Sequence, residues 1–215
     1  MVLETKELIK IYKEKKDEIR DKLDILSGVW NEKEERIFAE LCFCLLTPQS
    51  KAEKCLEAIT SLEKTGILFK GDENEIKSYL TGVRFKNKKA RYIIKTRDYF
   101  FNGRKANFKE KIDPRDVNGS REFLVENIIG IGYKEASHFL RNIGLGYQLA
   151  ILDRHILNNL NEYRVINEDL DKLNLTRKKY LEIEEKMRGF SNKINIPMAE
   201  LDLLFWSMKT GKILK

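Results

Sequence analysis

Apolar residues recur along most of this chain at intervals of three and four positions, the spacing of one face of an α-helix. Residues 4 to 26 combine this spacing with many charges, as an amphipathic surface helix does. No run of alternating β-branched residues indicates a strand. The pattern predicts helices over residues 4–26, 31–47, 51–64, 73–80, 87–101, 121–129, 134–143, 154–161, 177–188 and 198–209. The predicted fold class is therefore all-α.

Polar residues and prolines mark several of the predicted helix ends. Asn31 followed by Glu34 resembles a capping box that starts the second helix, which stops at Thr47 before Pro48. Pro197 stands where a first-turn proline opens the last helix. The chain has three prolines, no Gly/Ser-rich linker and no evident internal repeat. We therefore expect a compact helical protein without a flexible hinge.

A short glycine-containing turn joins the helices predicted over 121–129 and 134–143. Gly130 and Gly132 allow a positive φ and let other backbone approach closely. The helix after the turn begins with free N–H groups, which bind a phosphate without reading base sequence. Many ordinary helix–helix connections also contain glycine, so the turn alone leaves both interpretations open.

Lys134 is the first candidate for chemistry. Ala136, Phe139 and Leu140 form the apolar side of its helix, whereas Lys134, His138 and Arg141 share the other side. A lysine that lies among cationic groups and is partly desolvated has a lowered pKa, and its neutral amine is a nucleophile. The alternative is an ordinary solvated lysine.

Asp153 follows an apolar run over residues 149–152 and precedes a predicted helix. An aspartate there is a good N-cap, worth roughly 1 kcal/mol. The two roles are compatible, because capping holds the carboxylate at the edge of a cleft. His155 falls in the first turn of the same helix, where a phosphate is favoured.

Composition narrows the class of partner. The net charge is +7, which favours a polyanion such as DNA, although a merely Lys-rich proteome gives the same sign. Hydrophobic residues make up 42% of the 215 residues, enough for one large domain or two small ones. The three cysteines, Cys42, Cys44 and Cys55, fit neither a disulfide framework nor a zinc site, and we interpret them as buried apolar residues in a reducing compartment.

The location that follows is the cytoplasm. The first residues are charged throughout and lack the apolar stretch of a signal peptide. The longest apolar run, residues 41–46, is too short to span a bilayer, so we expect no membrane partner.

The combined motifs resemble one enzyme superfamily. A G-x-G-x-K hairpin followed by Asp-x-His is similar to the base-excision signature of the helix-hairpin-helix DNA glycosylases. The surrounding segments resemble the archaeal-type 8-oxoguanine DNA glycosylase/AP lyase branch: KEASHFLRN, LAILDRHIL, the terminal TGKILK, LCFCLLT near residue 41 and RFKNKKARYI near residue 84. The iron–sulfur cysteines of the endonuclease III branch are absent from the sequence.

This resemblance implies a fold and a reaction. Two helical subdomains, residues 34–147 and residues 1–33 plus 148–215, flank an active-site cleft. The substrate is double-stranded DNA with 8-oxoguanine or an abasic site, acted on by a monomer that needs no metal or organic cofactor. Lys134 attacks C1′ of an everted nucleotide, expels the base and forms a Schiff base that permits β-elimination. Asp153 keeps the amine neutral or stabilises positive charge on the sugar.

Other matched positions carry expectations about DNA contact. Arg84 and Phe85 lie in a basic segment that probes the duplex in this family, although Phe85 also fits a core position. Gln49, in LTPQS, replaces the asparagine that relatives carry after LTA, which puts its wedge role in doubt. Trp206 fits either stacking on the everted purine or the core. The α-carboxylate of Lys215 is an expected acceptor for the N7 hydrogen that 8-oxoguanine has and guanine lacks.

Two other functions stay open at this point. An endonuclease III-like lyase for oxidised pyrimidines would use the same Lys134 and Asp153 with a different pocket. A non-catalytic helix-hairpin-helix module would grip DNA and need neither residue, so their joint presence counts against it.

Overall fold

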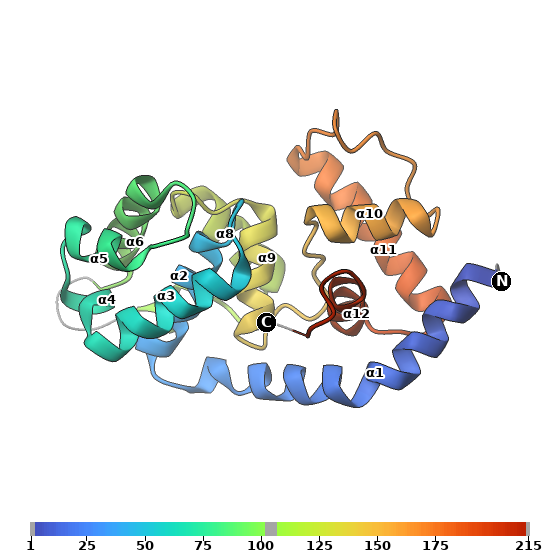
Figure 1. The fold of residues 1–215 in the computed structure, drawn as a ribbon, viewed down its shortest axis with the longest axis horizontal. Helices are drawn as coiled ribbons and strands as arrows, with labels where there is room; N and C mark the ends of the chain where they lie inside the picture. Colours follow the sequence, from blue (N-terminus) through green and yellow to red (C-terminus); the bar gives the residue numbers. More distant parts are fainter. Residues whose placement is uncertain (1–2, 102–106, 214–215) are drawn as a thin grey trace.

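The computed structural model describes residues 3–101 and 107–213, and the secondary structure over these ranges is helical (Figure 1). The helices are α1 (Leu3–Ser27), the 3₁₀ helix η1 (Val29–Asn31), α2 (Glu34–Leu46), α3 (Ala52–Thr65), α4 (Ile67–Lys70), α5 (Glu73–Tyr79), α6 (Lys86–Phe100), α7 (Phe108–Lys111), α8 (Val117–Asn127), α9 (Tyr133–Asn142), α10 (Arg154–Glu162), α11 (Arg177–Ile194) and α12 (Met198–Thr210). The predicted all-α class is confirmed. Within the described ranges, no helix is long and apolar enough to cross a membrane.

The buried apolar side chains form two separate clusters. The first cluster runs from Val29 to Leu149 and includes residues of α2 to α9. The second cluster combines residues 8–26 of α1 with residues 150–205, which include α10, α11 and α12. Figure 1 shows α1 passing beneath both bodies of helices, so an early segment packs beside the last helix.

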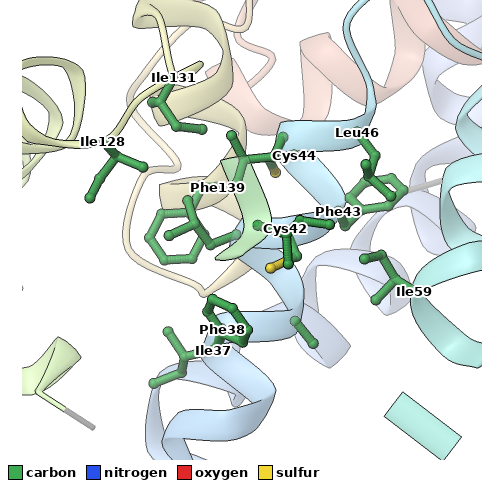
Figure 2. Close-up of a cluster of buried hydrophobic side chains, with 14 of the residues drawn as sticks. Ile37, Phe38, Cys42, Phe43, Cys44, Leu46, Ile59, Ile128, Ile131 and Phe139 are labelled. Atoms are coloured by element: carbon green, nitrogen blue, oxygen red, sulfur yellow. The ribbon is translucent and has the colours of Figure 1, made fainter. Parts of the chain in front are cut away.

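Helix α2 lies at the centre of the first cluster. Ten of its thirteen residues are buried, from Ile37 to Leu46, and nine of these ten are apolar, Glu40 being the exception. Such a helix is expected inside a core rather than on a surface. Figure 2 shows Cys42 and Cys44 among the phenylalanine and isoleucine side chains of this cluster. Cys42, Cys44 and Cys55 are buried free thiols, which confirms their apolar role.

One buried ion pair joins the parts of the chain that carry the two clusters. Arg121 on α8 donates from Nη1 and Nη2 to the carboxylate of Glu184 on α11, at 2.7 Å and 3.0 Å. The same carboxylate accepts the backbone N–H of Ala150 at 2.7 Å, and Arg121 also reaches the Ser137 hydroxyl on α9 at 3.3 Å. The pair therefore connects α8, α9, α11 and the segment that leads to residue 153.

Several predicted helix ends were wrong. The N-cap of α2 is Lys33, and Asn31 instead ends η1, so the predicted capping box does not form. Pro197 is the N-cap of α12 rather than its first residue. Helix α8 begins at Val117, because the Asp116 carboxylate accepts the N–H of Gly119.

Two α-helices were missed, and the end of α11 was predicted too early. The missed helices α4 and α7 have four residues each, too few to show a periodicity. Helix α11 was predicted to end at residue 188, but it continues through Gly189 to Ile194. It ends where Asn195 takes the left-handed conformation, with φ of 55°.

Candidate active site

The cavity that holds the predicted catalytic residues is lined by segments that lie far apart in the sequence. Its volume is about 410 Å³. Its lining residues come from the α2–α3 loop and the start of α3, from α9, from residues 151–155 and from α12. They are Thr47, Gln49, Ser50, Lys51, Ala52, Glu53, Lys134, His138, Arg141, Ile151, Asp153, His155, Asp202, Leu203, Trp206 and Thr210.

Lys134 is the second residue of α9 and is half-buried in this cavity. Its Nζ lies 3.4 Å from Thr47 Oγ1 and 3.5 Å from Glu135 Oε1. His138 and Arg141 line the same cavity, as the predicted shared stripe requires. The opposite side of α9 is buried through residues 136, 139 and 140, which confirms the predicted packing. The helix therefore turns its lysine toward the cavity.

Asp153 reaches the same cavity from the segment before α10. Its Oδ1 accepts the N–H of Ile156 at 2.8 Å, which confirms the predicted N-cap of α10. The cap fixes the carboxylate at the cavity wall, because the bond restrains its side-chain rotation. Lys134 and Asp153, 19 positions apart in the sequence, thus line one cavity.

Three further predicted residues also line this cavity. His155 is half-buried in the first turn of α10, and its Nδ1 is buried without a hydrogen-bond partner among the described residues. Gln49 is exposed and has a left-handed backbone, with φ of 53°. Trp206 is half-buried beside Leu203, so its ring belongs to the cavity wall rather than to a sealed core.

The hairpin glycines lie outside the cavity lining and differ from each other. Gly130 has φ of 86°, and a Cβ added there would lie 2.4 Å from Cδ2 of Tyr92. The expected positive φ and the expected close approach of other atoms are therefore both found at Gly130. Gly132 has φ of −104°, so the expected positive φ was wrong there. Its N–H donates to Glu135 Oε2 at 3.3 Å.

Arg84 and Phe85 also lie outside the cavity lining. Phe85, the N-cap of α6, is left-handed with φ of 58°, and half of it is exposed, so the core alternative was wrong. The Arg84 guanidinium lies 5.3 Å from the centre of the Phe85 ring. The Arg84 N–H donates to Ser50 Oγ at 3.0 Å, which places this turn beside the α2–α3 loop. Lys215 lies outside the described residues.

Asp202 is a cavity residue that the sequence reasoning missed. It is only 5% exposed on α12. Burial raises its pKa to about 7, an increase that Arg141 opposes and the charge of Asp153 reinforces. Its Oδ2 lies 3.8 Å from Nη2 of Arg141. An aspartate inside the apolar run DLLFW was the available signal, because a charge at such a position is rarely buried without a partner.

The cavity therefore brings together the amine of Lys134, the carboxylates of Asp153 and Asp202 and the ring of Trp206. An amine can form an imine with an aldehyde carbon, which neither a hydroxyl nor a carboxylate can do. Among the residues that the structure describes, no group of three His, Cys, Asp or Glu side chains is placed to hold a metal ion.

The family model for 8-oxoguanine DNA glycosylase matches residues 10–196. The chain belongs to this family. The 8-oxoguanine DNA glycosylase/AP lyase of Fusobacterium nucleatum is 45% identical over 211 residues, covering 97% of this chain and 96% of that protein. The enzyme of the same name from Methanocaldococcus jannaschii is 41% identical, covering 96% and 98%.

Solved structures of 8-oxoguanine DNA glycosylases share this fold. The Methanocaldococcus jannaschii 8-oxoguanine DNA glycosylase matches with a TM-score of 0.85 at 37% identity, covering 98% of this chain and 95% of that one. The glycosylase/lyase from the same organism, in complex with a 15mer DNA containing 8-oxoguanine, matches with a TM-score of 0.81 at 37% identity, covering 97% and 99%. The fold of this family member therefore corresponds to that of relatives over nearly its whole length.

Proposed function

We propose that this chain excises 8-oxoguanine from double-stranded DNA and cleaves the resulting abasic strand, with Lys134 as the nucleophile. The observation that carries this proposal is the cavity in which Lys134 and Asp153 lie together, in a member of the 8-oxoguanine DNA glycosylase family. Relatives that carry the name 8-oxoguanine DNA glycosylase/AP lyase cover nearly the whole chain.

The reaction begins at C1′ of a nucleotide swung out of the duplex. The neutral amine of Lys134 bonds to C1′, and the C1′–N9 bond breaks with its electron pair leaving on the base. The proton lost by the amine passes through Asp153 to the departing base. Asp153 also faces the positive charge that develops on the sugar, which is why its capped, fixed position matters.

Strand cleavage follows from the same covalent bond. The C1′–O4′ bond opens, O4′ takes a proton and a protonated imine joins C1′ to Nζ of Lys134. The imine acidifies the C2′ hydrogens, so loss of one C2′ proton expels the 3′ phosphate as the C3′–O bond breaks. Water then hydrolyses the imine and restores the lysine. A hydroxyl or a carboxylate in place of the amine could not form this imine and so could not support the second stage.

Other residues would bind the DNA around the reacting nucleotide. Gly130 and Gly132 would place the hairpin backbone near a phosphate, and the half-buried His155 would lie near one at the start of α10. Arg84, Phe85 and Gln49 would contact the duplex, because all three residues are exposed. Trp206 would stack on the everted base, and the Lys215 carboxylate would accept its N7 hydrogen.

The domain division, the association state and the location are parts of the same proposal. The subdomains are residues 34–147 and residues 1–33 plus 148–215, and the two apolar clusters support this division. We expect a monomer, because one chain supplies every side chain named for the reaction. Three buried free thiols favour the reducing cytoplasm.

Borohydride trapping tests the proposal. The protein is incubated with duplexes that contain one 8-oxoguanine, one oxidised pyrimidine or no lesion, and borohydride then reduces any imine. We expect a covalent adduct with 8-oxoguanine that Lys134→Gln abolishes while duplex binding persists. Lys172→Gln, at an exposed lysine, is the control for lost charge.

Each other outcome identifies a different function. An adduct with the oxidised pyrimidine alone would assign the chain an endonuclease III-like activity. Binding without any adduct would make it a non-catalytic module. Trapping that persists in Lys134→Gln would mean that another amine is the nucleophile.

A further inference from the structure

Lys89 is a buried lysine that the proposed reaction does not use. It lies on α6 and is only 4% exposed, which is rare for a lysine. Its Nζ lies 2.7 Å from the carbonyl oxygen of Leu46, 2.7 Å from that of Pro48 and 3.0 Å from Ser50 Oγ. All three partners belong to the end of α2 and the loop after it. The ammonium therefore fastens the α2–α3 loop to α6.

The same contacts fasten a second segment. Ser50 Oγ, which binds Lys89, also accepts the N–H of Arg84 at 3.0 Å. The backbone N–H of Lys89 donates to the carbonyl of Phe85 at 3.0 Å. Lys89 and Ser50 thus join the loop that carries Gln49 to the turn that carries Phe85.

The two joined segments share an unusual backbone conformation. Gln49 and Phe85 are two of the four described non-glycine residues with a positive φ. A non-glycine residue in this conformation persists only where its surroundings hold it there. Both residues are exposed, so their backbone conformation must be restrained by contacts on the side that faces away from solvent. The contacts of Lys89 and Ser50 supply this restraint.

We propose that Lys89 is a positioning residue that holds Gln49 and Phe85 as one rigid pair, which enters the duplex as the damaged nucleotide leaves it. The proposal rests on the proposed glycosylase function and deepens it. A rigid pair lowers the cost of binding, because neither side chain nor loop must be ordered when the DNA is opened. Lys89 touches neither the base nor C1′ in this role, and it acts through the loop and the turn.

A lysine suits this position in both of its protonation states. As an ammonium it offers three N–H donors to the three oxygens around it. Burial lowers the pKa of Lys89 to about 8, with Lys134 and Arg84 adding to the decrease and Cys55 and Glu135 opposing it. The neutral amine keeps two donors for the two carbonyls, and the Ser50 hydroxyl can then donate to Nζ. The junction therefore survives near neutral pH whichever form is present.

Lys89→Met tests the proposal, because methionine has a similar length but no donors. Ser50→Ala removes the shared acceptor with little loss of volume. Lys95→Met, at an exposed lysine on the same helix, is the matched control for lost charge. Single-turnover excision is measured with 8-oxoguanine paired to cytosine and with 8-oxoguanine in an unpaired bulge, where eversion costs less.

We expect Lys89→Met to slow excision from the paired duplex by roughly 10–100-fold, the scale of a small misplacement of a working group. The defect should be several-fold smaller with the bulged lesion. Ser50→Ala should show the same selectivity, and the double variant should be no slower than Lys89→Met alone, because both substitutions break one junction. Lys95→Met should affect both substrates equally.

A second readout follows eversion without chemistry. In a Lys134→Gln background, 2-aminopurine beside the lesion should brighten more slowly when Lys89 is methionine. An equal defect on paired and bulged lesions, or unchanged brightening, would overturn the positioning role. If Lys89→Met does not fold, Ser50→Ala decides alone, since an unselective or absent effect overturns the proposal. Failure of the proposed function looks different, because the unsubstituted protein would then excise no 8-oxoguanine.

Discussion

Replacing Arg121 with methionine should lower the stability of this protein far more than any change to a surface ion pair. Both side chains of the pair are almost fully buried, with 2% of Arg121 and 5% of Glu184 exposed. Methionine keeps the apolar stem but leaves the Glu184 carboxylate with the Ala150 N–H and with the half-buried Arg188, whose Nη2 lies 3.7 Å from Oε1. A buried charge that is only partly compensated is the expected result.

The magnitude follows from that geometry. Removing one partner of a buried ion pair typically costs about 3–5 kcal/mol, because the remaining charge stays out of water. For a chain of about this size, 1 kcal/mol lowers Tm by roughly 2–4 °C, so Tm should fall by at most about 6–20 °C, because Arg188 offsets part of the loss. The double variant with Glu184→Leu should recover much of this loss, although the Ala150 N–H then lacks its acceptor.

Urea unfolding followed by circular dichroism measures the free energy, and a thermal scan measures Tm. Lys172→Met is the control, because its partner Asp169 and Lys172 itself are largely exposed, and its Tm should not change measurably. A loss below about 1 kcal/mol for Arg121→Met would mean that the pair behaves like a solvated one. The Arg121–Glu184 pair would then not be a stabilising joint between α8 and α11.

Three further outcomes are expected. Asp153→Asn should keep the cap of α10 and the affinity for duplex DNA but lower the excision rate by ~10²–10⁴-fold in single-turnover assays. A rate near that of the unsubstituted protein would mean that Asp153 takes no part in the reaction. Because the pKa of Asp202 is raised to about 7, the folded state binds an extra proton between about pH 4 and 7. The free energy of unfolding, measured relative to Asp202→Asn in urea titrations, should therefore fall as pH rises through that window, by at most about 4 kcal/mol. A difference between the two proteins that does not depend on pH would contradict this prediction. Gly130→Ala should lower the free energy of unfolding by about 1–3 kcal/mol, because residue 130 has φ of 86° and lies against the Tyr92 ring. Gly132→Ala should lower it by less, and equal losses for the two variants would contradict this prediction.

Helical periodicity was enough to place the long helices. Their apolar positions recur over several turns, so α2, α6 and α12 were placed within a few residues of their ends. The errors arose where a local contact outweighed the pattern. The Asp116 carboxylate extends α8 backwards, and the left-handed Asn195 ends α11 a turn and a half later than predicted. Such contacts depend on one side chain and leave no periodic trace.

Some residues of the candidate site could likewise be predicted from the sequence, and others could not. The helix-start positions of Lys134 and Asp153 were predictable from a glycine turn and an apolar run, whereas their catalytic roles were expected only from the resemblance to the helix-hairpin-helix glycosylases. Lys89 was not predictable, since nothing within NKKAR distinguishes the buried lysine from its exposed neighbour Lys88. Asp202 became visible as a cavity residue only when α12 was placed against α9, an arrangement that depends on contacts between distant segments.

The packing of α1 on α12 has a consequence for synthesis on the ribosome. The Tyr12 hydroxyl donates to Glu200 at 2.6 Å across 188 positions of sequence. At translation rates of about 5–20 residues per second, α1 waits roughly 10–40 s for its partner helix. Helix α12 also supplies Asp202 and Trp206, so a growing chain that already contains Lys134 and Asp153 still lacks one wall of its cavity. A prematurely ended product would thus carry the reactive amine without the pocket that aims it at DNA.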